Sequence, residues 1–69
     1  MFRIKEYKNK LLRDRLKEIH DNNIIYDNIK IYDINLKCWI VNDYVIQDYK
    51  LQKEVSVKNE LILYVYKQR

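Results

Sequence analysis

The chain contains no glycine and no proline among its 69 residues. Glycine adopts positive φ most readily, so its absence removes the backbone needed for phosphate loops, dinucleotide-binding turns and nucleophile elbows. Nucleotide-binding enzymes of those types are therefore excluded. Turns must use Asn and Asp, which tolerate the left-handed region better than other residues with a side chain. The Asn and Asp pairs at 22–23, 27–28 and 42–43 are the expected turns.

Chain length predicts one small domain, residues 1–69, with a core of marginal stability. The single cysteine, Cys38, excludes an internal disulfide, and Cys38 and His20 together cannot supply four ligands for a structural zinc ion. We expect no metal and no cofactor. The remaining ways to stabilise such a core are oligomerisation or a large partner, and a small stable monomer is the alternative.

Composition and charge indicate a source and a class of partner. Lys, Asn, Ile and Tyr, whose codons are AT-rich, dominate, which indicates the AT-rich genome of a low-GC bacterium, its phage or a large DNA virus. The net charge of +4 favours nucleic acid or acidic protein surfaces. No apolar run approaches the roughly 20 residues of a membrane span, and no secretory signal follows Met1. With a free cysteine, we expect a cytoplasmic protein, inside a host cell if the source is viral.

Residues 4–21 have the composition of a helix that ends at 21–23. Two adjacent apolar stripes at helical spacing give it one wide apolar face: Ile4, Tyr7 and Leu11, then Leu12, Leu16 and Ile19. Lys8 and Arg15 interrupt this pattern. Either their alkyl stems lie along the core edge, or residues 2–7 form a strand and Asn9 caps a helix that starts at Lys10. We favour the single helix.

Beyond Ile24, short alternating runs of Ile, Val and Tyr predict strands. The first covers residues 24–32, with a break at 27–28. The next two form a hairpin that turns at Asn42-Asp43. Four of its cross-strand pairs are expected to face the helix: Ile40 with Val45, Cys38 with Gln47, Leu36 with Tyr49, and Ile34 with Leu51. The opposite face carries Trp39, Val41, Tyr44 and Ile46 with charged residues at its rim.

A second hairpin fits residues 54–67 and turns at 59–60. Two cross-strand pairs define its register: Val57 with Ile62 and Val55 with Tyr64. Its last strand is apolar on both faces, which indicates either a central strand covered on both sides or an interface. The sequence therefore predicts an α+β fold, with one N-terminal amphipathic helix packed on a three- to five-stranded antiparallel meander.

Residues with catalytic chemistry are few and scattered, so we expect no enzyme and no catalytic site. His20 is expected at the helix C-terminus as a surface or capping residue. Cys38 is expected on the inward hairpin face as a small core residue. The strand-region aspartates show no metal-loop spacing and are expected at turns and edges: Asp27, Asp33, Asp43 and Asp48.

One helix covers only one face of a sheet, so an apolar and aromatic face is left for solvent, a second copy or a partner. Trp and Tyr are preferred anchors of protein interfaces. We therefore predict a small non-enzymatic protein-interaction module, a phage or virus inhibitor or adaptor that docks on a host macromolecular complex or self-associates. The expected partner-binding residues are Trp39, Tyr44, Ile46, Tyr64 and Tyr66.

The alternative function is nucleic-acid binding. Strand aromatics could stack on bases, as in sheet-based single-strand binders, and a basic helix could contact phosphates. The expected basic residues are Lys8, Lys10, Arg13, Arg15 and Lys17. The simpler interpretation is that the tyrosines are present as strand formers and that the lysines lie on a solvated helix face.

A third function comes from a resemblance. A helix containing DRLKEIHDN, followed by strands that end in ELILYVYKQR, resembles the RelE-type ribonuclease toxins in element order and basic C-terminus. Those toxins are small basic α+β proteins that cut messenger RNA with scattered basic and aromatic residues. This chain is short for that family and shows one helix, so the resemblance ranks third.

Overall fold

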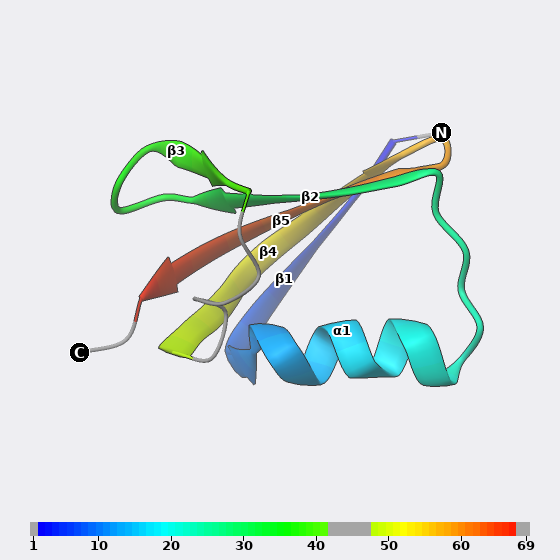
Figure 1. The fold of residues 1–69 in the computed structure, drawn as a ribbon, viewed down its shortest axis with the longest axis horizontal. Helices are drawn as coiled ribbons and strands as arrows, with labels where there is room; N and C mark the ends of the chain where they lie inside the picture. The colour runs from blue at the N-terminus through cyan, green and yellow to red at the C-terminus, as the bar shows by residue number, and fades with distance from the viewer. Residues whose placement is uncertain (1, 42–47, 68–69) are drawn as a thin grey trace.

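A single five-stranded sheet with one helix on one face forms the fold. The computed structural model describes residues 2–41 and 48–67. Its elements are β1 (Phe2–Leu11), α1 (Leu12–Asp21), β2 (Asn28–Asp33), β3 (Cys38–Ile40), β4 (Tyr49–Val57) and β5 (Glu60–Lys67). The strand order is β1-β4-β5-β2-β3, and α1 lies along one side of the sheet (Figure 1). The β2–β5 pair is parallel and the others are antiparallel, so the α+β class is confirmed but the pure meander is wrong.

The N-terminal segment is a strand, so the prediction of one helix over residues 4–21 is wrong for its first half. β1 pairs along its length with β4, from Phe2 opposite Val57 to Leu11 opposite Lys50. These cross-strand hydrogen bonds and contacts override the local helix propensity of the segment. The alternative that placed a strand at residues 2–7 was therefore closer to the structure.

Asn9 does not cap the helix. It lies in β1 where the register with β4 shifts between Glu6 and Lys10, and its φ of 56° is in the left-handed region. The helix begins three residues later, at Leu12, with Leu11 at the N-cap and no side-chain cap. Asn9 therefore lies at an irregularity of β1, and Asn tolerates the positive φ that this position has.

The predicted end of the helix at 21–23 is confirmed. The backbone N–H of Asn22 donates to the Glu18 carbonyl at 3.0 Å, and that of Asn23 donates to the His20 carbonyl at 3.1 Å. Asn23 has a φ of 55°, so it takes the left-handed position that often closes a helix. His20 is exposed in the last helical turn, as expected.

The strand after the helix begins at Asn28, and β3 pairs back onto it instead of forward onto the following strand. Ile31, Tyr32 and Asp33 lie opposite Ile40, Trp39 and Cys38, respectively. The predicted pairs of Leu36 with Tyr49 and of Ile34 with Leu51 are therefore wrong, because Tyr49 lies opposite Lys67 and Leu51 opposite Val65. The predicted turn at 42–43, with Tyr44, Val45, Ile46 and Gln47, lies outside the described residues.

The second hairpin is confirmed with a register two residues from the predicted one. Val57 lies opposite Glu60 and Val55 opposite Ile62, so the turn is Lys58-Asn59, with Lys58 at a φ of 55°. A shift of two residues keeps every side chain on its predicted face. β5 is a central strand between β4 and β2. Its Leu61, Leu63 and Val65 lie in the core, whereas Ile62 and Tyr64 lie on the opposite face of the sheet.

The core lies between α1 and the sheet. Its buried members are Leu12, Ile19, Ile31, Tyr49, Leu51, Leu61, Leu63 and Val65. Leu12 and Ile19 supply the helix side, and alternate residues of β5 supply the centre of the sheet side. Cys38 is exposed, so the prediction that it fills the core is wrong. No helix in the described part of the chain is long and apolar enough to cross a membrane.

Candidate functional site

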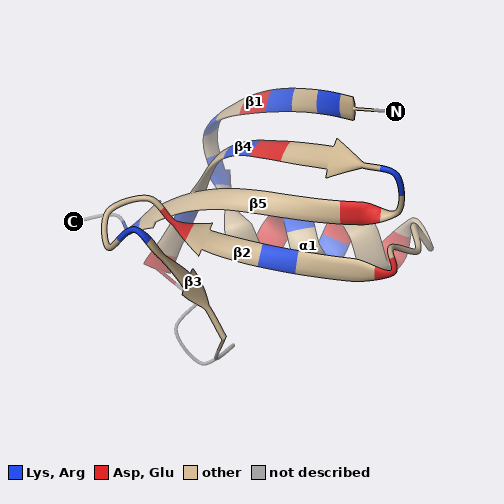
Figure 2. Cartoon of the chain, turned by 90° about the horizontal axis from the view of Figure 1, so that it is seen from above, with Lys and Arg blue, Asp and Glu red and all other residues tan. Residues whose placement is uncertain are grey.

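None of the described residues covers the sheet face opposite α1, called the open face here, and this face is largely apolar. Figure 2 views it with α1 behind the strands. Alternation along each strand sends one set of side chains to α1 and the other to this face. Cross-strand register identifies its apolar and aromatic members as Phe2, Ile4, Tyr32, Trp39, Val55, Val57, Ile62, Tyr64 and Tyr66. Phe2 and Ile4 are 62% and 55% exposed, so a contiguous part of this apolar surface faces solvent.

Three rings form an aromatic row across β3, β2 and β5. The Tyr32 ring contacts the Trp39 ring edge to face at a centroid distance of 5.0 Å and the Tyr64 ring at 5.7 Å. Lysine ammonium groups lie over the two outer rings. Lys30 Nζ is 5.8 Å from the Trp39 centroid, and Lys53 Nζ is 4.9 Å from the Tyr64 centroid. Each such cation–π contact stabilises by about 0.5–1 kcal/mol at an exposed site.

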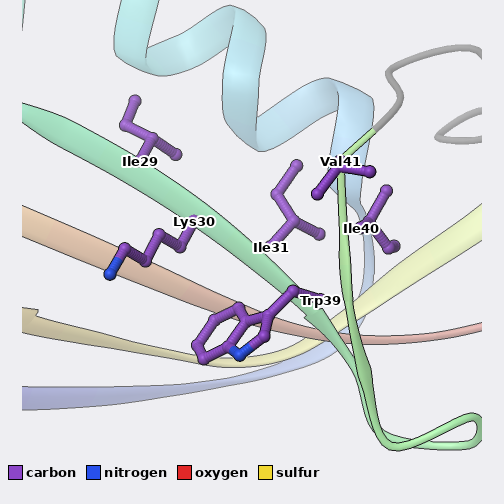
Figure 3. A pocket seen from close by; sticks show the side chains of 6 residues that line it. All are labelled: Ile29, Lys30, Ile31, Trp39, Ile40 and Val41. Carbon is purple, nitrogen blue, oxygen red and sulfur yellow. The ribbon is translucent and has the colours of Figure 1, made fainter.

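An open groove of about 470 Å³ lies beside this row, at the edge of the sheet (Figure 3). It is lined by Ile29, Lys30, Ile31, Trp39, Ile40 and Val41. Figure 3 shows the three isoleucines and Val41 on the α1 side of β2, with Lys30 and Trp39 on the other side. Val41 is 95% exposed and Trp39 is 49% exposed. The groove therefore has apolar side chains on both sides of β2, at the β3 edge of the sheet.

Glu54, on the α1 side of β4, is a buried carboxylate that lies inside a hydrogen-bonded cluster. Arg15 Nε and Nη2 donate to its two carboxylate oxygens at 3.1 and 3.2 Å, and the Tyr7 hydroxyl donates to it as well. Burial and the hydrogen bond to Glu54 raise the pKa of the Tyr7 phenol. Burial lowers the pKa of Arg15, but the hydrogen bond to Glu54 and the negative charge of that carboxylate together outweigh burial, so the net pKa is raised. The cluster joins β1, α1 and β4, which indicates a structural role.

Asp33 is a second buried carboxylate, which the sequence placed only at a turn or edge. It accepts hydrogen bonds from the Tyr49 hydroxyl at 2.5 Å and from the backbone N–H of Asn35 and Leu36 at 2.8 and 3.1 Å. Burial raises the pKa of this carboxyl, but these hydrogen bonds together lower it below its ordinary value. The hydrogen bond to Asp33 raises the pKa of the Tyr49 phenol to about 12. Asp33 thus holds the turn between β2 and β3.

Acidic, histidine and cysteine side chains do not form a metal-binding cluster anywhere in residues 2–41 and 48–67. Cys38 and His20 are both exposed, on β3 and at the end of α1. The open face itself offers apolar and aromatic side chains, the ammonium groups of Lys30 and Lys53, and Glu6, which lies opposite Lys53.

Three of the five predicted partner-binding residues lie on one face of the sheet. Trp39 and Tyr64 are the ends of the aromatic row, and Tyr66 follows Tyr64 on the same face of β5. Tyr44 and Ile46 lie outside the described residues. Sequence reasoning missed Tyr32, the ring between Trp39 and Tyr64. The alternation of Lys30 and Tyr32 with Ile29 and Ile31 was the signal that could have found it.

The five basic residues predicted to cluster on the helix are divided between two elements. Lys8 and Lys10 belong to β1, whereas Arg13, Arg15 and Lys17 belong to α1. Two of them form ion pairs. Lys10 Nζ lies 2.6 Å from a Glu18 carboxylate oxygen, and Arg15 contacts Glu54 as well as Glu18, the latter at 3.6 Å. A single basic helical face is therefore not formed.

The open face and its groove are the described surface best suited to a macromolecular partner, because they combine exposed apolar area with an exposed tryptophan. The aromatic row adds rigid rings, and the lysines add a fixed positive charge at each end. Comparisons with protein-family models, with curated protein sequences and with solved structures found no match to this chain.

Proposed function

We propose that this chain is a non-enzymatic protein-interaction module whose open face binds a protein partner. One observation carries the proposal: a half-exposed Trp39 stands at the junction of the aromatic row and the apolar groove. Interface hot spots are enriched in tryptophan and tyrosine at the centre of an apolar patch. The isoleucines of the groove extend the apolar centre around Trp39, and the lysines of the row form its charged rim.

The partner's chemistry follows from the surface. Apolar side chains of the partner fit the groove walls formed by Ile29, Ile40 and Val41. Acidic side chains fit opposite Lys30 and Lys53, whose ammonium groups lie above the outer rings. With a net charge of +4, the chain is also steered toward an acidic partner surface.

The AT-rich composition favours a phage or virus inhibitor or adaptor that acts by covering a surface of a host complex. Small size suits such a role, because a short chain can occupy a binding surface without a catalytic site. A second copy of the chain would use the same apolar surface, and the light-scattering mass of the purified chain identifies that case.

The test is capture of a partner from host extract, followed by reconstitution with the purified partner. Trp39→Ala is expected to weaken the measured affinity at least about tenfold, because a truncated hot-spot residue removes more than 1.4 kcal/mol of binding free energy. Trp39 lies on an edge strand and is half-exposed, so the variant is expected to fold. Circular dichroism checks the fold of each variant.

Ile25→Ala is the matched control, because Ile25 is an exposed apolar residue in the link between α1 and β2, outside the open face. It is expected to leave the affinity within about twofold of the wild type. Equal losses in both variants, or an unchanged affinity for Trp39→Ala, would show that the partner binds elsewhere.

Single-stranded nucleic acid is the second candidate ligand, because the aromatic row has a lysine over each outer ring. Base stacking on such rings contributes about 1–3 kcal/mol per base. Fluorescence anisotropy of a labelled oligonucleotide at low and high salt separates the two functions. A steep loss of affinity with salt, removed by Trp39→Ala, would favour nucleic acid over protein.

A further inference from the structure

We propose a second interaction surface at the outer edge of β1, where an extended segment of another protein adds a strand to the sheet along residues 2–6. The segment that fits this edge alternates apolar and acidic residues. Among the described strands β1 has β4 as its single neighbour, and Figure 2 shows no described element beside its other edge. This edge lies at the opposite end of the strand order from Trp39, so the proposal is independent of partner binding at the aromatic row.

The two edge strands of the sheet differ in what they offer to an added strand. β3 has three residues, whereas β1 has ten. Residues 2–6 of β1 pair with β4 in an unbroken register, which shifts only after Glu6. The backbone N–H and C=O groups that point away from the neighbour of a regular edge strand are a template for another strand. Short edge strands and bulges reduce this tendency, so residues 2–6 are the described edge segment best suited to pairing.

Side-chain exposure shows what an added strand would bury. Val55 lies on the open face between Ile4 of β1 and Ile62 of β5, and it is only 8% exposed because a strand flanks it on each side. Ile4 lies on the same face with a described strand on one side only, and it is 55% exposed. A strand beside β1 would bury Ile4 as its two neighbours bury Val55, and Phe2 would gain a similar contact. Apolar residues of the segment therefore belong on the open face, beside Ile4 and Phe2.

The charge of β1 selects the residues that alternate with these apolar ones. Lys5 is exposed on the α1 side of β1, and its ammonium group lies 5.2 Å from the centroid of the Tyr7 ring. An acidic residue directly opposite Lys5 on an added strand would stabilise the pairing, whereas a basic residue would be repelled. A second copy paired about a two-fold axis at Ile4 or Lys5 meets this repulsion, because Lys5 then lies opposite Arg3 or opposite its own counterpart. The occupant is therefore an acidic and apolar segment of a different protein.

The experiment is a titration of ¹⁵N-labelled protein with the end-blocked peptide Ser-Val-Glu-Val-Glu-Val-Ser, followed by NMR and by amide hydrogen exchange. We expect saturable shifts in residues 2–6 and slower exchange of those amides in this segment that point away from β4. Two further peptides are each expected to bind at least about fivefold more weakly. One has the same composition with its Val and Glu residues in separate blocks, and the other has Lys in place of Glu. Equal binding of all three peptides, or shifts without slower exchange in residues 2–6, would overturn the proposal.

Two variants of β1 test the residues that select the segment. Ile4→Thr is expected to weaken binding of the alternating Val and Glu peptide about fivefold, since threonine keeps the branched β-carbon of a strand former but removes apolar contact. Lys5→Gln is expected to weaken it about threefold and to reduce the discrimination against the Lys peptide. Both side chains are exposed on an edge strand, so both variants are expected to fold.

Ile25→Thr is the matched control, because Ile25 is 85% exposed in the link between α1 and β2, away from β1. It is expected to leave peptide binding unchanged, and equal weakening by Ile25→Thr and Ile4→Thr would overturn the site. A dimer in light scattering that Ile4→Thr dissociates would also overturn it, because a second copy would then occupy the edge. Trp39→Ala is expected to retain peptide binding, so failure of the open-face proposal and failure of this one are distinguishable.

Discussion

At the scale of single residues, two buried carboxylates organise this small protein. Asp33 and Glu54 are 1% and 5% exposed. A buried carboxylate is tolerated only when it is hydrogen-bonded, and both are: Asp33 by Tyr49 and two backbone N–H groups, Glu54 by Arg15 and Tyr7. Neither carboxylate could be recognised from the sequence, because strand alternation gives a face but not the partner across it.

Tyr49→Phe is expected to lower the free energy of unfolding by about 1–3 kcal/mol at pH 7, because it removes a hydrogen bond to a buried charge. The pKa of Asp33 is lowered in the folded protein, so its contribution is present above about pH 4 and is lost as pH falls through the folded pKa. The difference between wild type and variant should therefore shrink at pH 3. Urea unfolding at both pH values measures it.

Tyr66→Phe is the matched control for that prediction, since Tyr66 is a half-buried tyrosine of the neighbouring strand, on the opposite face of the sheet. Its expected change is under about 0.5 kcal/mol at either pH. An equal effect of the two variants, or a Tyr49→Phe effect that grows in acid, would contradict the role given to the Tyr49–Asp33 hydrogen bond.

At the scale of elements, the junction between β1 and α1 decides the fold. Residues 4–11 carry a helical stripe formed by Ile4, Tyr7 and Leu11, but pairing with β4 makes the segment a strand. The positive φ of Asn9 accompanies the register shift before Lys10. α1 begins directly after β1, at Leu12, whose side chain is fully buried.

Two substitutions at Asn9 test this junction against each other. Asn9→Ala is expected to be less stable than Asn9→Gly by about 1–2 kcal/mol, because a residue with a Cβ is strained at positive φ and glycine is not. Both variants lose the Asn9 side chain equally, so the comparison isolates the backbone. Thermal unfolding measures the difference, and an Ala variant as stable as the Gly variant would argue against a left-handed Asn9.

Other elements show where sequence reasoning succeeds. The second hairpin was predictable because its two strands are adjacent in the chain and joined by a two-residue turn. The parallel pairing of β2 with β5 was not, because it joins segments distant in sequence, and alternation does not identify a strand's neighbour. For the same reason Tyr32, whose ring contacts that of Trp39 across β2 and β3, was missed.

At the scale of the whole molecule, the two faces of the sheet have different properties. One face packs on α1 and holds the core and the buried carboxylates. The other carries the aromatic row and the exposed apolar residues of β1. The sequence predicts one helix, which covers only one face of a sheet, so an open face was predictable. Which residues share that face was not predictable, because it depends on the strand order.

The most direct test of partner binding at the open face uses Trp39, the single tryptophan, as the reporter. The chain is labelled with 5-fluorotryptophan and titrated with the purified partner, and the ¹⁹F NMR resonance is followed. The account predicts that the resonance shifts and saturates at the stoichiometry of the complex. A resonance that stays unchanged while size-exclusion chromatography shows the complex has formed would contradict it.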